Sequence, residues 1–111
     1  MGEYKRVEIQ DLQKIDFNNT LIEVLGYVPK ARFYSSKFAD GYILSPQSGR
    51  VDFYSLNEET IARIKDAYQN LRCVIFQGRG IGQKLQIEEV ISQDENKPSL
   101  NKKNGISPIE D

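Results

Sequence analysis

The chain has 111 residues, of which 39% are hydrophobic and 28% charged, and its formal net charge at pH 7 is −1. This length and composition predict one soluble globular domain with a small core. With no histidine and a single cysteine, the chain cannot by itself assemble the usual zinc ligand sets, a Ser–His–Asp or Cys–His arrangement, or an internal disulfide framework.

The acidic residues do not favour an enzyme either. Glu58 and Glu59 are sequence neighbours, as are Glu88 and Glu89, and adjacent side chains point to opposite faces of a strand or diverge by about 100° on a helix. We therefore expect a non-catalytic protein without cofactor or metal. The chain has no run of about 18 apolar residues and no apolar region of a signal peptide, so we expect a cytoplasmic protein that does not bind membranes.

Three segments before the middle of the chain have strand patterns. Residues 20–28 (TLIEVLGYV) are rich in β-forming residues, and the internal Gly26 predicts a bend, a bulge or a close backbone approach. Residues 40–46 (DGYILSP) open with an Asp-Gly turn signal, and residues 50–56 (RVDFYSL) alternate, so the two predict a hairpin. Residues 5–12 (KRVEIQDL) add a short strand or turn ahead of these.

One helix follows. Asn57 is a suitable N-cap, Glu58 and Glu59 complement the helix dipole in the first turn, and Asn70 ends the helix by tolerating a left-handed conformation. The apolar residues recur at helical spacing and draw one stripe: Ile61, Ile64, Tyr68 and Leu71.

After the helix, residues 71–77 (LRCVIFQ) predict an apolar strand and residues 84–91 (KLQIEEVI) a last one. We assign Phe53 and Phe76 to the core. Residues 1–92 are thus predicted to form a barrel domain, and residues 93–111 a polar tail, disordered because it shows no apolar period.

The stretch QGRGIGQK at residues 77–84 has glycines at positions 78, 80 and 82. A P-loop needs G-x-x-x-x-G-K-[ST] between a strand and a helix, and a dinucleotide fingerprint needs G-x-G-x-x-G; neither spacing is present. We interpret the stretch as the loop that joins the last two strands, with glycines supplying positive φ or close backbone approach.

The order strand, strand, strand, helix, strand, strand resembles the OB-fold over residues 7–91. The lead-in VEIQDL, the first strand LIEVLGYV with its internal glycine and the closing hairpin CVIFQGRGIGQKLQIEEV are similar to that family's pattern. The resemblance implies a mainly β fold, a five-stranded Greek-key OB-like barrel with one helix between the third and fourth strands. An SH3-like barrel is the main rival and fits the helix less well.

The resemblance also implies a function, the binding of single-stranded DNA or RNA with little sequence preference. In the nucleic-acid-binding members, aromatic side chains on the second and third strands stack on bases, and the loops after the first and fourth strands clamp the backbone. The end of the first strand and the first loop would supply Tyr27, Lys30, Arg32, Phe33, Tyr34 and Lys37. The second and third strands would supply Tyr42 (or Ile43, depending on register), Arg50 and Tyr54. The last loop would supply Arg79 and Lys84.

Other interpretations remain open. Tyr27 and Tyr42 could pack in the barrel wall, Phe33 or Phe38 could fold the first loop back onto the barrel, and Lys30 and Arg32 could pair with nearby acids. The alternative function is a protein–protein interaction or homo-oligomerisation module, for example a subunit or an antitoxin-like inhibitor of a larger complex.

Overall fold

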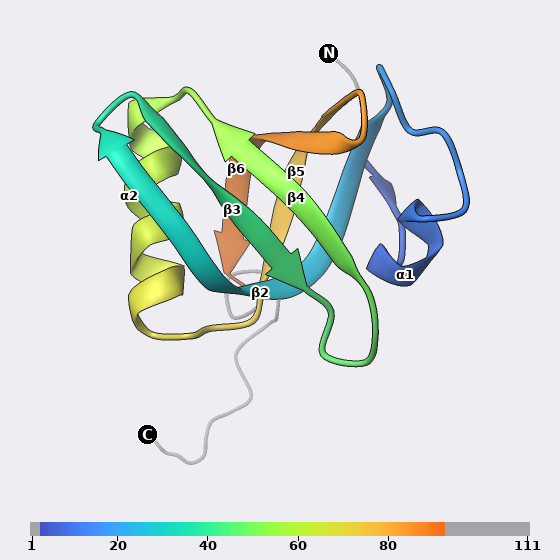
Figure 1. Ribbon diagram of the computed structural model, residues 1–111, viewed down its shortest axis with the longest axis horizontal. Helices are drawn as coiled ribbons and strands as arrows, with labels where there is room; N and C mark the ends of the chain where they lie inside the picture. The colour runs from blue at the N-terminus through green and yellow to red at the C-terminus, as the bar shows by residue number, and fades with distance from the viewer. Residues whose placement is uncertain (1–2, 93–111) are drawn as a thin grey trace.

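The computed structural model describes residues 3–92, which form a closed five-stranded barrel with two helices packed against it (Figure 1). In chain order the elements are β1 (Lys5–Arg6), α1 (Ile9–Leu12), β2 (Leu21–Ser35), β3 (Phe38–Leu44), β4 (Arg50–Ser55), α2 (Glu58–Gln69), β5 (Val74–Ile81) and β6 (Lys84–Ser92). The predicted class is confirmed: the fold is mainly β, and α2 lies between the third and fourth strands of the barrel, β4 and β5.

The barrel closes because β2 is long enough to pair with two neighbours. Its first part, up to Gly26, pairs with β5, and the remainder pairs with β3, both antiparallel. The order β3–β4–β6–β5 completes the ring, with β4 and β6 parallel. The close approach predicted at Gly26 is confirmed, since a Cβ there would lie 2.5 Å from Ile43 Cγ2 and 2.6 Å from the Leu44 carbonyl oxygen.

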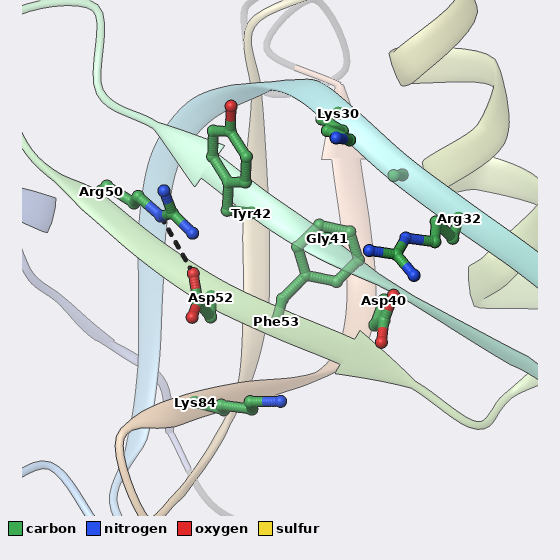
Figure 2. A pocket seen from close by; sticks show the side chains of 10 residues that line it. Lys30, Arg32, Asp40, Gly41, Tyr42, Arg50, Asp52, Phe53 and Lys84 are labelled. Carbon is green, nitrogen blue, oxygen red and sulfur yellow. Dashed lines mark hydrogen bonds and ion pairs between the residues drawn. The ribbon is translucent and has the colours of Figure 1, made fainter.

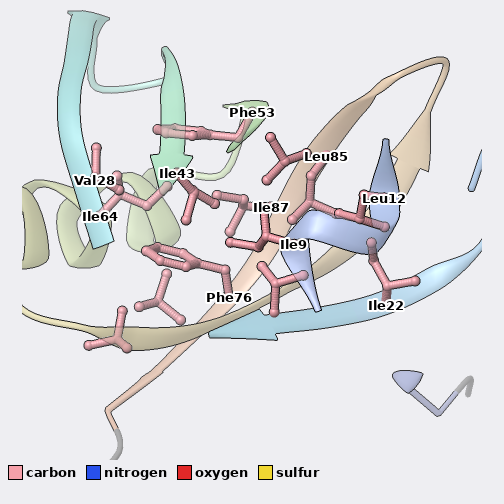
Figure 3. Packing of buried hydrophobic residues seen from close by; sticks show 14 of the residues in the cluster. Ile9, Leu12, Ile22, Val28, Ile43, Phe53, Ile64, Phe76, Leu85 and Ile87 are labelled. Atoms are coloured by element: carbon pink, nitrogen blue, oxygen red, sulfur yellow. The ribbon is translucent and has the colours of Figure 1, made fainter. Parts of the chain in front are cut away.

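Side chains alternate between the inside and the outside along the strands, and those that point inward fill the core. Phe53 and Phe76 are fully buried, as predicted, and Figure 3 shows them among the aliphatic side chains. Helix α1 adds Ile9 and Leu12 to the same cluster, and α2 adds Ile64. The two helices lie on opposite sides of the barrel in Figure 1, so the core is covered from both.

Helix α2 begins where the sequence predicts. The Asn57 side chain accepts a hydrogen bond from the Thr60 N–H at 2.9 Å, and Glu58 and Glu59 occupy the first turn. This arrangement satisfies a backbone donor that has no partner within the helix, and it places negative charge at the positive end of the dipole.

The end of α2 differs from the prediction. Asn70 has a φ of −102°, whereas the positive φ, 48°, belongs to Leu71. Leu71 is therefore exposed rather than part of the apolar stripe, because the helix has already ended at Gln69; Ala67 is buried on the last turn instead.

The loop predicted after the first strand is mostly strand. β2 continues to Ser35, and only Ser36 and Lys37 form the turn to β3. Pro29 lies within a register shift between Tyr27 and Lys30, and such an irregularity tolerates a proline inside a sheet. The placement of Lys30, Arg32, Phe33 and Tyr34 in a clamp loop is thus wrong, since these residues belong to β2.

The turn predicted from Asp-Gly at the start of residues 40–46 is also wrong. Asp40 and Gly41 lie inside β3, where they pair with Arg32 and Ala31 of β2. Gly41 is required there by packing, because a Cβ would collide with the Lys30 carbonyl oxygen. The predicted hairpin between this segment and residues 50–56 is confirmed by the β3–β4 pairing.

The glycine-rich stretch is likewise strand rather than loop over most of its length. β5 extends to Ile81, so the turn to β6 consists of Gly82 and Gln83 only. Gly82 has the positive φ expected of a turn glycine, 65°, whereas Gly78 and Gly80 serve close contacts: a Cβ on Gly80 would meet the Phe17 carbonyl oxygen. The placement of Arg79 in a loop is therefore wrong.

At the N-terminal end, β1 pairs with β2 in parallel, with Lys5 opposite Ile22, which confirms a short strand ahead of the first long one. The predicted tail, residues 93–111, lies outside the residues that the structure describes. In the described part of the chain, neither helix has the length and apolarity needed to cross a membrane.

Candidate functional site

The outward surface of β2, β3 and β4 carries polar and aromatic side chains in cross-strand rows; we call it the β2–β3–β4 face. One row runs from Lys30 through Tyr42 and Asp52 to Lys84 of β6. The next row runs from Arg32 through Asp40 and Tyr54 to Gln86. Neighbours in such rows have Cβ atoms about 4.5–5.5 Å apart in antiparallel pairs, so their side chains can act on one ligand.

A hollow of about 260 Å³ lies on this face (Figure 2). Gly41 has no side chain to fill it, and Ala31 and Phe53 also contribute to its lining. The charged and aromatic residues around it come from four strands: Lys30, Arg32, Asp40, Tyr42, Arg50, Asp52 and Lys84. The register thus brings together residues that are up to 54 positions apart in the chain, Lys30 and Lys84.

Tyr42 is held by its neighbours on β4. The Arg50 guanidinium carbon lies 4.0 Å from the centre of the Tyr42 ring, and the Arg50 Nε donates to Asp52 Oδ1 at 3.1 Å. The ion pair orients the guanidinium, and the cation–π contact holds it against the ring. One side of Tyr42 is therefore occupied by the protein itself, and the other side is turned toward the hollow (Figure 2).

A second group of aromatic side chains lies near the turn between β2 and β3. Tyr34 and Phe38 stack with ring centres 5.1 Å apart, although 53% of Tyr34 and 38% of Phe38 remain exposed. The Tyr34 hydroxyl accepts from Arg32 Nη1 at 3.4 Å, and Lys37 is in the turn itself. We call this group the hairpin tip; it continues the β2–β3–β4 face along the same two strands.

Most of the predicted contact residues are gathered by the fold. Lys30, Arg32, Tyr42, Arg50 and Lys84 surround the hollow, while Tyr54 points outward beside Asp40. Tyr34 and Lys37 are at the hairpin tip, and Tyr27 lies outward in the row of Leu44 and Arg50. The open choice between Tyr42 and Ile43 is settled by the register, because Ile43 is fully buried.

Phe33 does not belong to this face. On the continued strand it alternates with Arg32 and Tyr34 and so packs inward against the core, with its ring centre 5.9 Å from that of Tyr68. The interpretation of Phe33 as a packing residue is the one that the structure supports.

Arg79 is also separated from the hollow. It lies on β5, where its backbone pairs with Leu21 at the start of β2 and with Gln86 of β6. Its charge acts instead on Tyr4, whose hydroxyl donates to Glu88 Oε1 at 2.8 Å. Burial, that hydrogen bond and the nearby carboxylates raise the pKa of Tyr4 to about 12, and Arg79 opposes the shift.

Two residues of the face were missed by counting only cations and aromatics. Asp52 is two residues from both Arg50 and Tyr54, so the alternation of residues 50–56 already placed all three side chains on the same side of the strand. Asp40 was assigned to a turn together with Gly41 and was therefore not considered as a side chain of the sheet surface. With them, the face and tip carry five cations (Lys30, Arg32, Lys37, Arg50 and Lys84) against two carboxylates, whereas the whole chain is nearly neutral.

The residues described offer no alternative metal chemistry, since within 3–92 no group of three or more metal-ligating side chains comes together. What the face can do chemically is to stack on a planar ring through Tyr42 and Tyr54, attract anions, and accept hydrogen bonds through its two carboxylates.

No protein-family model and no curated protein sequence matches this chain. Among solved structures it is similar to OBody AM1L10, a protein solved bound to hen egg-white lysozyme, with a TM-score of 0.50. The match has 15% sequence identity and covers 67% of this chain and 79% of that one. A likeness at this identity concerns the fold, and it places the chain among small barrel-like domains.

Proposed function

We propose that this protein is an OB-type barrel that binds single-stranded DNA or RNA, with little overall sequence preference, on the β2–β3–β4 face and the hairpin tip. Bases would stack on aromatic rings, and Lys and Arg side chains would contact phosphates. Neither step requires catalysis or a cofactor.

The observation that carries the proposal is the convergence of cations and aromatics from four strands around one hollow. Packing of the fold does not demand this arrangement, because Lys30, Arg32, Arg50 and Lys84 are all exposed. Three of these four have no ion pair within residues 3–92, so their charge is available to a ligand. A single strand combines planar bases with a regular row of anions, and such a face complements both.

The test is fluorescence anisotropy with labelled oligonucleotides of about twelve residues, a length within the range that one such barrel covers. Measurable binding near 50 mM salt that weakens steeply with added salt is the expected result. Tyr54→Ala should weaken binding with little change in the salt dependence, whereas Lys30→Gln should make it less salt-dependent. Absence of binding to both dT and rU oligomers at low salt would reject the proposal.

A second candidate function, protein–protein interaction or self-association, is favoured by the hairpin tip. Tyr34 and Phe38 expose a stacked aromatic pair that the barrel does not cover, and aromatic residues are enriched at protein interfaces. Sedimentation analysis over a range of concentrations tests self-association. A dimer that is lost in Tyr34→Ser but retained in Glu89→Gln, a change on the opposite wall, would favour this candidate.

A further inference from the structure

The ion pair between Arg50 and Asp52 is not explained by the stability of the fold. The side chains are 55% and 44% exposed, and exposed ion pairs contribute little to the free energy of unfolding. The Arg50 Nε nevertheless donates to Asp52 Oδ1 at 3.1 Å, and the guanidinium carbon lies 4.0 Å from the centre of the Tyr42 ring. The pair thus has a defined geometry, and the side chain on which it acts is Tyr42.

The strand register brings these three side chains together. Tyr42 pairs with Asp52 across β3 and β4. Arg50 lies opposite Leu44, two residues further along β3, so it approaches the Tyr42 ring from that end of the strand. Gly41 and the rest of the hollow lie toward the other end (Figure 2). The guanidinium therefore covers one side of the ring and leaves the side toward the hollow open.

Within residues 3–92, no hydrogen bond or second aromatic ring fixes the Tyr42 side chain. Its hydroxyl has no hydrogen-bond partner in this part of the chain, and the two aromatic pairs there do not include it. A tyrosine ring that turns away no longer offers a flat side to a base. Fixing a side chain before binding removes an entropy cost of binding, so a ring held in place stacks more tightly than one that is free to turn.

We propose that Arg50 and Asp52 are positioning residues. Asp52 orients the Arg50 guanidinium, and the guanidinium holds the Tyr42 ring with its open side toward the hollow, where one base stacks. Arg50 acts through the ring and does not itself contact a phosphate. The inference rests on the proposed function and deepens it, because it separates the residues that shape the stacking site from those that attract the strand.

The test is a charge-balanced variant. Arg50→Gln/Asp52→Asn removes one cation and one carboxylate, so the net charge of the face is unchanged while the contact with Tyr42 is lost. Its affinity for labelled dT and rU oligomers is measured by anisotropy on the full chain at several salt concentrations. We expect the affinity to fall about threefold to tenfold, the cost of leaving one side chain unfixed. The slope of log affinity against log salt should stay the same, whereas a lost phosphate contact would reduce it by about 0.7.

Arg72→Gln/Asp66→Asn is the matched control. It also removes a half-exposed ion pair, in which Arg72 Nη2 donates to Asp66 Oδ2 at 2.8 Å. That pair joins α2 to the segment after it and does not belong to the β2–β3–β4 face. The control should bind with the affinity of the unmodified protein, and thermal unfolding establishes that both variants are folded.

The same charge-balanced change in the Tyr42→Leu background separates positioning from direct contact. If Arg50 and Asp52 act only through the ring, their removal costs little further affinity once the ring is absent, so the changes are not additive. A direct contact with the strand would be lost equally in both backgrounds.

Three outcomes would overturn the inference alone, each with an unmodified protein that binds. They are equal affinity in the charge-balanced variant, a salt slope reduced by about 0.7, and an undiminished loss in the Tyr42→Leu background. Absence of binding by the unmodified protein would reject the proposed function together with the inference, so the two failures are distinguishable.

Discussion

Lys84 and Arg79 provide a sharp test of which wall of the barrel meets phosphates. Both are cations near the β5–β6 turn, but only Lys84 lines the hollow, opposite Asp52; Arg79 lies on β5 and acts on Tyr4. We expect Lys84→Gln to make oligonucleotide binding less sensitive to salt, and Arg79→Gln to leave the sensitivity unchanged.

The magnitude follows from the charges on the face. Of the five cations, Arg50 is already paired with Asp52, which leaves four for phosphates. Each contact with a single strand contributes roughly 0.7 to the slope of log affinity against log salt, so the slope should be about −2.8. Affinity should then fall about 50-fold between roughly 50 and 200 mM salt, and only about 20-fold in Lys84→Gln.

The assay is the same anisotropy titration at four or more salt concentrations, with thermal unfolding of each variant to establish that it is folded. Equal loss of slope in Lys84→Gln and Arg79→Gln would refute the assignment of the face, because it would mean that the strand contacts both walls. A slope near zero in the unmodified protein would refute phosphate contact altogether.

Three further results are expected. Tyr42→Leu should weaken oligonucleotide binding about tenfold or more in anisotropy titrations through loss of one stacked base, and an unchanged affinity would place the stacked base elsewhere. Thr60→Val should lower the free energy of unfolding, measured in urea, by about 1–3 kcal/mol. The reason is that the Thr60 hydroxyl donates to the Glu88 carbonyl at 2.9 Å, and valine leaves that acceptor unpaired. Thr60→Ser keeps the hydroxyl and should lose less stability, so equal losses in the two variants would contradict this explanation. Because the pKa of Tyr4 is about 12 in the folded protein and near 10 when unfolded, its stabilising effect should be complete below about pH 10 and lost as the pH rises toward 12. An ultraviolet titration should show a step of tyrosine ionisation near pH 12 that Tyr4→Phe removes; a titration curve that Tyr4→Phe leaves unchanged in this range would contradict the assignment.

The elements that local patterns control were predictable from the sequence. The alternation of residues 50–56, the apolar spacing of α2 and the cap at Asn57 each depend on neighbours within a few positions, and the structure agrees with them except at Leu71, which lies beyond the end of the helix. The five-stranded barrel followed from their order.

The predictions of strand ends and turns were wrong where tertiary contacts, rather than sequence neighbours, determine the local conformation. The first strand was predicted to end at Val28, but β2 continues past Pro29, because an irregularity in the β2–β3 pairing accommodates the proline. Gly41 and Gly80 suggested turns, yet both lie in strands, and each is needed because another backbone approaches too closely for a side chain. A distant chain segment that makes such an approach leaves no mark in the local sequence.

The candidate site was predictable in composition but not in arrangement. The cations and Tyr42 were identified through the OB-fold resemblance, from the strands and loops in which it placed them. Lys84 lies beside Asp52 because β4 and β6 pair in parallel, and Arg79 lies on the opposite wall because β5 pairs with β2 and β6. The β4–β6 pairing joins strands separated by a helix and a strand, so no short-range pattern could reveal it.

The hydrogen bonds around β6 bear on how this barrel can meet other chains. Beyond Gln86, β6 pairs with β5 but no longer with β4, so the carbonyl groups on its other side could have templated an added strand. Side chains occupy them instead: Ser55 donates to the Ile87 carbonyl, Thr60 to that of Glu88, and Arg63 to that of Val90. A second copy or an extended peptide would have to displace all three donors to add here. Strand addition at this edge is therefore disfavoured, and a chain that meets β6 here would do so through side-chain contacts.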